Sequence, residues 1–399
     1  MFFLLVSPGE TNCDNPAAYF GHHSGMKSLA VIATVWYPFS HADVIVKRWL
    51  KPDVGRDGPW GFSGKETQIA SVYLAQVPEN DIGVGLCEKH SVPRFDSIEA
   101  ALTLGTGELA VDGVLLIGEH GDYPTNHYWQ KLYPRKEFFD EIIAVFEKSQ
   151  KIVPIFCDKH FSWNGVWAQQ MWQTIQEKRI PWLAGSSVSL VGFRHATLGR
   201  VLPPENERIL EGVCTFNVGP EAYGFHSLEL AASVLERCSG AAYNITSVTA
   251  LAGEDVFAAL TDGRIPTDLL DACLAAEGLT QAGLRENLAS ASVETEYCPV
   301  NPTAFLIEHS DGVRVWHLCL QGHVANFSVA FRTERSIFAG TADCGGYEDF
   351  FHHFAALNAQ IEKLVLTGTC DVPPERTLST TLTIERCCHA LAEVLCHAS

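Results

Sequence analysis

The stretch Val111-Asp-Gly-Val-Leu-Leu-Ile117 is followed at once by Gly118-Glu-His-Gly-Asp-Tyr-Pro124, and this junction decides the fold. The mostly apolar first part predicts a buried parallel strand, because such strands are hydrophobic on both faces. Open α/β sheets bind their ligands at the carboxyl ends of such strands. The same pattern recurs where Ile152–Phe156 precedes Cys157-Asp-Lys-His160. Two strand ends therefore carry acidic and basic side chains toward one cleft, which is typical of an enzyme.

Outward from this junction, strands alternate with helices between residues 27 and 190. The predicted strands are 28–35, 68–74, 111–117, 152–156 and 181–185, and the predicted helices are 41–50, 98–104, 136–148 and 163–178. A segment rich in glycine and proline, 52–64, is predicted to be a long loop. Alternation at this spacing indicates an α/β fold with a Rossmann-like, doubly wound parallel sheet.

The pattern changes after about residue 190. It predicts a helix at 225–237, a strand at 246–252, an antiparallel meander at 305–307, 313–320 and 325–331, and long helices at 348–366 and 376–395. Ser310-Asp-Gly312 supplies the first turn of the meander.

We therefore expect an N-terminal extension (1–26), a Rossmann-like domain (27–190), and an α+β domain (191–399) with a mostly antiparallel sheet, for substrate binding and oligomerisation. An exposed face on that sheet would suit a homodimer.

Composition limits the classes of partner. The chain has 399 residues, 47% of them hydrophobic and 19% charged, as in globular proteins. Its net charge of -19 argues against nucleic acid or an anionic membrane as partner, since both are polyanions. No run approaches the roughly 20 apolar residues of a membrane span. The apolar start Met1–Val6 lacks the basic segment of a signal peptide, and thirteen cysteines without a CxxC pair predict a reduced, cytoplasmic protein.

Several segments, taken in order, resemble the Gfo/Idh/MocA-type oxidoreductases. Cys87–Leu102 is similar to the segment after the second strand of that family, and Asp158-Lys-His160 stands where the family has Glu-Lys-Pro. Gly224-Phe-His226, followed by Glu229, resembles the family's Gly-x-His-x-x-Asp motif. The resemblance covers roughly residues 27–395. It implies a nicotinamide cofactor, a lysine that binds and polarises the substrate, and a catalytic histidine.

The chain departs from the family where the cofactor should bind. A dinucleotide fold needs glycines after its first strand so that the backbone can approach the pyrophosphate. The corresponding turn, Ala33-Thr-Val-Trp-Tyr-Pro-Phe-Ser40, has none, and Tyr73-Leu-Ala-Gln76 lacks the acidic residue expected to bind the ribose. Ala222 stands where the family often has an aspartate, four residues before His226. These departures argue against ordinary NAD(P) binding, which stays open as an alternative.

The residues gained are of the types that bind divalent metals. Glu119, His120, Asp158, His160 and His226 supply carboxylates and imidazoles, a set suited to zinc, manganese or iron. Adjacent residues leaving a strand point in opposite directions, so we expect His120 or Glu119 to bind together with His160 and His226. A metal there would acidify a bound water or polarise a substrate carbonyl.

Further residues are candidates for catalysis and substrate binding. Lys159 could stabilise an oxyanion, or act as a base if desolvation lowers its pKa. Asp122 and Tyr123 are candidate proton donors or substrate hydrogen-bonding groups. Arg194, near the domain junction and beside His195, could hold a carboxylate or phosphate of the substrate. Structural roles stay open for these residues, including a turn for Asp122 and an ion pair for Arg194.

The sequence favours a metal-assisted non-redox enzyme: a lyase, isomerase or hydrolase of a small polar substrate, such as a sugar or hydroxy acid. The alternative is an NAD(P)-dependent oxidoreductase of a sugar or polyol, with a remodelled cofactor loop and with Lys159 and His226 in the family's roles. A second alternative is a non-catalytic binding protein. The density of titratable groups disfavours it, because isolated buried charges are costly unless they are used or paired.

Overall fold

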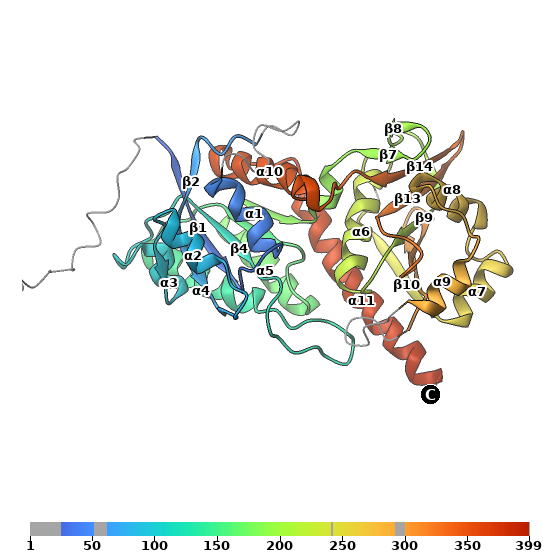
Figure 1. Cartoon of the computed structure of the whole chain (residues 1–399), viewed down its shortest axis with the longest axis horizontal. Coiled ribbons are helices and arrows are strands. Elements are labelled where there is room, and N and C mark those ends of the chain that lie inside the picture. Colours follow the sequence, from blue (N-terminus) through green and yellow to red (C-terminus); the bar gives the residue numbers. More distant parts are fainter. Residues whose placement is uncertain (1–24, 52–61, 241, 292–299, 399) are drawn as a thin grey trace, which may run out of the picture.

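The computed structural model describes residues 25–51, 62–240, 242–291 and 300–398, which form two lobes joined by a long helix (Figure 1). Nearly all of the predicted N-terminal extension lies outside the described residues, as does most of the loop predicted at 52–64.

The first lobe is built on a parallel sheet with the strand order β3-β2-β1-β4-β5-β6. Its strands are β1 (Lys27–Ala33), β2 (Thr67–Leu74), β3 (Arg94–Phe95), β4 (Gly113–Ile117), β5 (Ile155–Asp158) and β6 (Trp182–Gly185). Its helices are α1 (His41–Leu50), α2 (Gly83–Lys89), α3 (Ile98–Thr103), α4 (Arg135–Ser149) and α5 (Gly165–Lys178). The predicted doubly wound sheet is confirmed. The strand order reverses between β1 and β4, which is where such sheets bind ligands.

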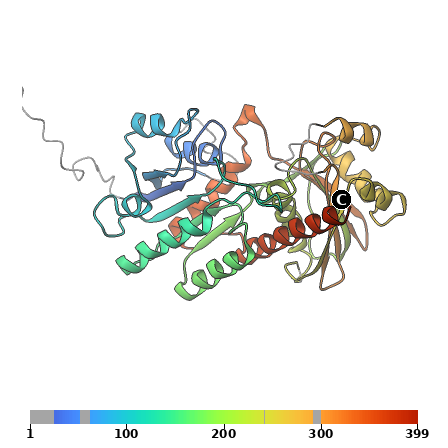
Figure 2. The ribbon, with the colours of Figure 1, turned by 90° about the horizontal axis from the view of Figure 1, so that it is seen from below.

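Helices cover both faces of this sheet because alternate strand residues point to opposite sides. Ala30 and Ile32 pack against α3, α4 and α5 on one face. Leu29 and Val31 pack on the other face against α1 and against α10 (His353–Thr367), although α10 comes late in the chain. The last helix, α11 (Pro374–Ala398), packs against α5, and Figure 2 shows α4, α5 and α11 side by side.

The second lobe contains a sheet with the strand order β10-β11-β12-β9-β13-β14-β7-β8. Its strands are β7 (Phe193–His195), β8 (Gly199–Val201), β9 (Ile209–Phe216), β10 (Ile245–Ala252), β11 (Thr303–His309), β12 (Arg314–Cys319), β13 (Ser328–Thr333) and β14 (Ile337–Ala342). Its other helices are α6 (Ala222–Leu235), α7 (Glu254–Thr261), α8 (Thr267–Glu277) and α9 (Leu284–Ser290). The neighbouring strands of this sheet pair antiparallel except β9 with β12, so the mostly antiparallel sheet is confirmed.

The predicted meander is correct for its first turn and wrong for its last step. β11 and β12 form an antiparallel hairpin, and Gly312 supplies the left-handed turn with φ +86°. β13 does not pair with β12, because β9 lies between them, parallel to β12 and antiparallel to β13. The second half of β9 is buried, so this strand needs a partner on each edge.

Helix α6 belongs to the second lobe and begins at the cleft. Nearly all of its residues are buried, and it packs against α11 and β9. Its first turn faces the carboxyl ends of the first lobe's strands. Among the described helices, none is long and apolar enough to cross a membrane.

Candidate active site

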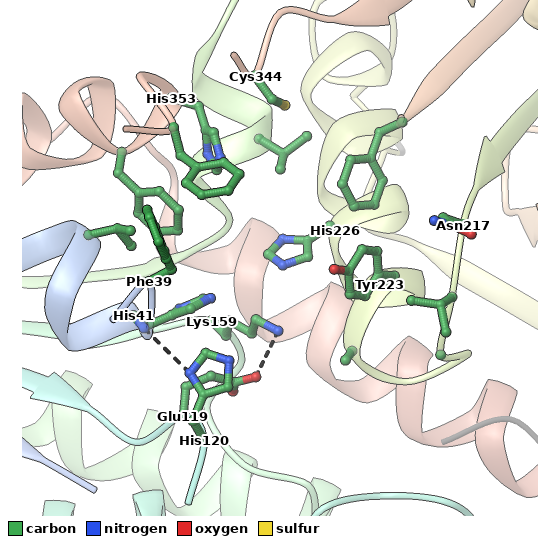
Figure 3. A pocket seen from close by; sticks show the side chains of 18 of the residues that line it. Phe39, His41, Glu119, His120, Lys159, Asn217, Tyr223, His226, Cys344 and His353 are labelled. Atoms are coloured by element: carbon green, nitrogen blue, oxygen red, sulfur yellow. Dashed lines mark hydrogen bonds and ion pairs between the residues drawn. The ribbon is translucent and has the colours of Figure 1, made fainter. Parts of the chain in front are cut away.

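A cavity of about 670 Å³ lies between the two lobes at the carboxyl ends of β4 and β5. Figure 3 shows Glu119, His120 and Lys159 on the side of the first lobe, and Tyr223 and His226 on the side of α6. The two strand ends singled out in the sequence therefore meet at one site.

Glu119, just beyond β4, balances two cations. The residue is 6% exposed, and its side chain accepts hydrogen bonds from Arg135 and from Lys159, whose Nζ lies 2.9 Å from Oε1. Arg135, at the start of α4, is fully buried and also donates to the backbone carbonyl of Asp158. Burial opposes ionisation of Glu119, but Lys159 and Arg135 lower its pKa well below 4.5. The carboxylate is therefore ionised and already engaged.

Lys159 follows β5 in a left-handed backbone conformation, with φ +61°. Such a conformation disfavours residues with a Cβ atom, so the surroundings must hold it. Its carbonyl accepts a hydrogen bond from the amide of Gly185 at the end of β6. The side chain is buried, and its ammonium group lies between Glu119 and His226 (Figure 3).

His226 lies in the first turn of α6 and lines the cavity. Its Nδ1 is 2.6 Å from Oγ of Ser186, which leaves Nε2 for a ligand. Burial, and then the charges of Lys159 and His41, lower the pKa of His226 well below 6.5, so the imidazole is neutral near pH 7. Tyr223, one turn before, lies edge-on to this ring with centroids 6.2 Å apart.

The other predicted metal ligands bond to protein groups. Nδ1 of His41 lies 2.6 Å from Oδ2 of Asp158. The backbone amide of His41 also donates to Nδ1 of His120. Nε2 of His160 lies 3.2 Å from Oε1 of Glu221, whose other oxygen accepts from a backbone amide.

The predicted metal centre is wrong. Among the described residues, no group of three or more histidine, cysteine, aspartate or glutamate side chains is placed to hold a metal ion. The reason is that each carboxylate already bonds to a basic side chain of the protein. Glu119 bonds to Arg135 and Lys159, Asp158 to His41, and Glu221 to His160. These partners come from segments distant in the sequence.

Asp122 and Tyr123, predicted as proton donors, do not line the cavity. The backbone amide and carbonyl of Asp122 bond to the side chain of Gln76, at 2.8 and 3.0 Å. Tyr123 packs edge-on against Tyr133, and burial raises its pKa to about 12.

Arg194 and His195, predicted to bind substrate, lie on β7 and also do not line the cavity. Nε of Arg194 is 3.6 Å from Asp343, with both side chains about half exposed. Nδ1 of His195 bonds to Thr197 in the next turn. The ion pair left open for Arg194 in the sequence is present.

Sequence reasoning missed three residues of the site. Tyr223 and His41 line the cavity, and Arg135 holds Glu119. A signal existed for His41, because Ser40 is a good N-cap and helix N-termini in this fold face the cleft. Nothing local marks Arg135 as buried, since it begins an amphipathic helix.

No protein-family model matches the chain, and no curated protein sequence matches it. Solved structures do match. GenD2 from gentamicin A biosynthesis, in complex with NAD, is 13% identical with a TM-score of 0.56, over 98% of each chain.

Two further solved structures match over 92% of this chain and over 97% of their own chains. A myo-inositol dehydrogenase from Corynebacterium glutamicum is 12% identical with a TM-score of 0.53. An oxidoreductase from Agrobacterium radiobacter, in complex with NAD+, L-tartaric acid and magnesium, is 12% identical with a TM-score of 0.54.

These similarities contradict the favoured prediction of a non-redox enzyme, because the matching proteins include a myo-inositol dehydrogenase and an oxidoreductase, and two of the three are complexes with NAD. They also contradict the cofactor prediction, a divalent metal in place of NAD(P), and agree with the alternative drawn from the sequence. The sequence-based prediction gave more weight to the glycines missing from the β1–α1 turn than to the order of the other family motifs. The chain has the two-domain fold of the Gfo/Idh/MocA oxidoreductases.

Proposed function

We propose that this protein is a nicotinamide-dependent oxidoreductase acting on a hydroxyl or carbonyl group of a small polar substrate, such as a sugar or polyol. One observation carries the proposal: Lys159 and His226 face each other across one interlobe cavity, in a fold shared with dehydrogenases. Fold alone does not establish function, whereas a lysine and a neutral histidine facing one cavity supply groups that can act on a hydroxyl or carbonyl.

The residues around the cavity fit the reacting end of a nicotinamide cofactor better than its diphosphate. Lys159, His226 and Tyr223 offer one cation and polar ring groups to a small reacting centre. The β1–α1 turn has no glycine that would let a diphosphate approach the backbone, and the buried side chain of Trp36 fills the space there. Trp36 packs so closely on Gly83 that a Cβ atom added to Gly83 would lie 2.7 Å from Cβ of Trp36.

The diphosphate would instead meet the N-terminus of α1, where Phe39 and His41 line the cavity. The partial positive charge of a helix N-terminus favours anions. When bound, the cofactor would supply or accept the hydride.

Lys159 binds the substrate oxygen and stabilises charge on it. Its ammonium group is fixed by Glu119 at 2.9 Å, so it needs little rearrangement to donate a hydrogen bond into the cavity. Donors fixed in advance and shielded from water are effective at stabilising a developing negative charge.

His226 moves the proton. In the tautomer that donates Nδ1–H to Ser186 Oγ, the neutral ring presents an unprotonated Nε2, which accepts a proton from a substrate hydroxyl during oxidation and returns it during reduction. Tyr223 limits the position of this ring and covers the cavity beside it.

The test combines binding with turnover. NADH or NADPH at millimolar concentration should raise the melting temperature by mass action. Polyol oxidation should fall roughly 10²- to 10⁴-fold in Lys159→Met and in His226→Gln. Arg194→Gln, outside the cavity, serves as the matched control and should keep wild-type turnover. The absence of a melting shift with both cofactors would refute the proposal.

A further inference from the structure

Beside the cavity lies a cluster of four aromatic rings, which we call the aromatic mouth: Phe39, Tyr347, Phe350 and Phe351. Phe39 lies edge-on to Tyr347, with centroids 4.9 Å apart, and Tyr347 lies 4.9 Å from Phe351. Phe39 is also 6.1 Å from both phenylalanines. Phe39, Tyr347 and Phe351 line the cavity.

The rings at the mouth are unusually open to solvent. Phe39 is 45% exposed and Tyr347 is 69% exposed. Single exposed apolar side chains are common, but adjoining ones beside a cavity mark a binding surface. Aromatic rings gain most from a flat partner, by offset stacking or edge-to-face contact.

The backbone of the mouth is strained in a way that the fold maintains. Phe39, Phe350 and Phe351 have φ values of +63°, +56° and +53°, in the left-handed region that bulky residues avoid. Buried Arg48 holds the last two, donating from Nη2 to the carbonyls of Phe350 and Phe351 at 2.5 and 3.2 Å. Its guanidinium also lies 4.9 Å from the centre of the Phe350 ring. Strain held in this way is typical of ligand-binding sites.

We infer that the aromatic mouth is a stacking subsite for a planar ring of a ligand whose other end reaches Lys159 and His226. The inference rests on the proposed function only for the position of the reacting end. The cavity volume of about 670 Å³ falls in the range of about 300–1,000 Å³ typical of sites for larger small molecules. The ring could be the adenine of the cofactor or an aromatic group carried by the substrate.

Two probes separate these sources, each measured by isothermal titration calorimetry. Adenosine monophosphate carries the adenine without a nicotinamide, and 4-nitrophenyl glucoside carries a ring on a sugar. Tyr347→Ala should weaken one of the probes by about tenfold, the usual size of a stacking contact. Loss for adenosine monophosphate assigns the mouth to the cofactor, and loss for the glucoside assigns it to the substrate.

The controls isolate the ring. Tyr347→Phe keeps the aromatic face and should bind within twofold of wild type. Leu202→Ala removes a similarly exposed apolar side chain from the second lobe and should change nothing. Phe39→Ala should repeat the loss seen with Tyr347→Ala, because both rings line the same mouth.

Equal affinity of wild type and Tyr347→Ala for both probes would overturn the inference, as would failure of wild type to bind either. Where adenosine monophosphate is the probe weakened by Tyr347→Ala, Lys159→Met should leave its binding within twofold; a large loss would place that probe at the reacting end and overturn the inference. Ring binding that depends on Tyr347, together with no response to NADH or NADPH, would refute the proposed function and leave the subsite standing.

Discussion

Replacing Glu119 with glutamine removes the charge that holds two buried cations beside the cavity. Arg135 is fully buried and Lys159 is 5% exposed, and both bond to this one carboxylate. Glutamine keeps the shape and one acceptor oxygen, so packing is preserved while the charge is lost. The variant therefore tests electrostatics rather than volume.

The expected cost follows from the burial of the cations. Removing one partner of a buried ion pair costs about 3–5 kcal/mol, because the remaining charge is left uncompensated. Although two cations lose their partner here, the amide oxygen of glutamine still accepts from one of them. We therefore expect Glu119→Gln to lose about 3–5 kcal/mol, a large part of a typical stability of about 5–15 kcal/mol.

The loss should depend on pH in a defined direction. Burial opposes ionisation of Glu119, but Lys159 and Arg135 lower its pKa well below 4.5. The unfolded chain takes up this proton near 4.5 and the folded chain does not. The advantage of wild type over Glu119→Gln is thus complete above 4.5 and shrinks below it, by about 1.4 kcal/mol per pH unit.

Urea unfolding followed by circular dichroism measures the loss of stability and its pH dependence, when it is carried out near neutral pH and about one unit below 4.5. The control is Asp122→Asn, which neutralises an exposed carboxylate in the same loop and should stay within about 0.5 kcal/mol of wild type. The reasoning fails if Glu119→Gln lies within about 1 kcal/mol of wild type at neutral pH, or if the difference does not shrink in acid.

Three other predictions concern stability. Burial lowers the pKa of His317 to about 3, so the folding stability linked to this group should fall as pH drops from 6.5 toward 3. His317→Gln should therefore flatten the plot of melting temperature against pH, whereas the control His195→Gln should not. Trp36→Ala should cost about 3–5 kcal/mol in urea unfolding, because it leaves a cavity under the β1–α1 turn; a loss below about 1 kcal/mol would show that this turn collapses freely. Gln76→Ala removes two hydrogen bonds to the backbone of Asp122 and should speed hydrogen exchange in the loop after β4, which unchanged exchange would contradict.

The sequence predicted the first lobe well because its signals are local. β1 and β4 are buried on both faces, so they read as continuous apolar runs. The error in the second lobe has the opposite cause: β9 enters between β12 and β13 from about a hundred residues away, and no local pattern encodes such a pairing.

The same distinction explains the candidate site. The ends of β4 and β5 were predicted to meet, and Glu119 and Lys159 do form an ion pair there. Their chemistry was misread because residue types in a cluster suit a metal as well as they suit an ion-pair network. Only the partners decide between these, and Arg135 and Glu221 come from parts of the chain that the sequence does not connect to the strand ends.

The arrangement of buried charge then indicates what the cavity can stabilise. Glu119 pairs with Lys159 at 2.9 Å, and both side chains line the cavity together with His226. His226 is kept neutral by burial and by the neighbouring cation. One cation next to one neutral imidazole suits an oxygen that gains negative charge as it loses a proton, since the first group stabilises the charge and the second takes the proton. The oxidation of a hydroxyl group, as in the proposed function, makes this demand.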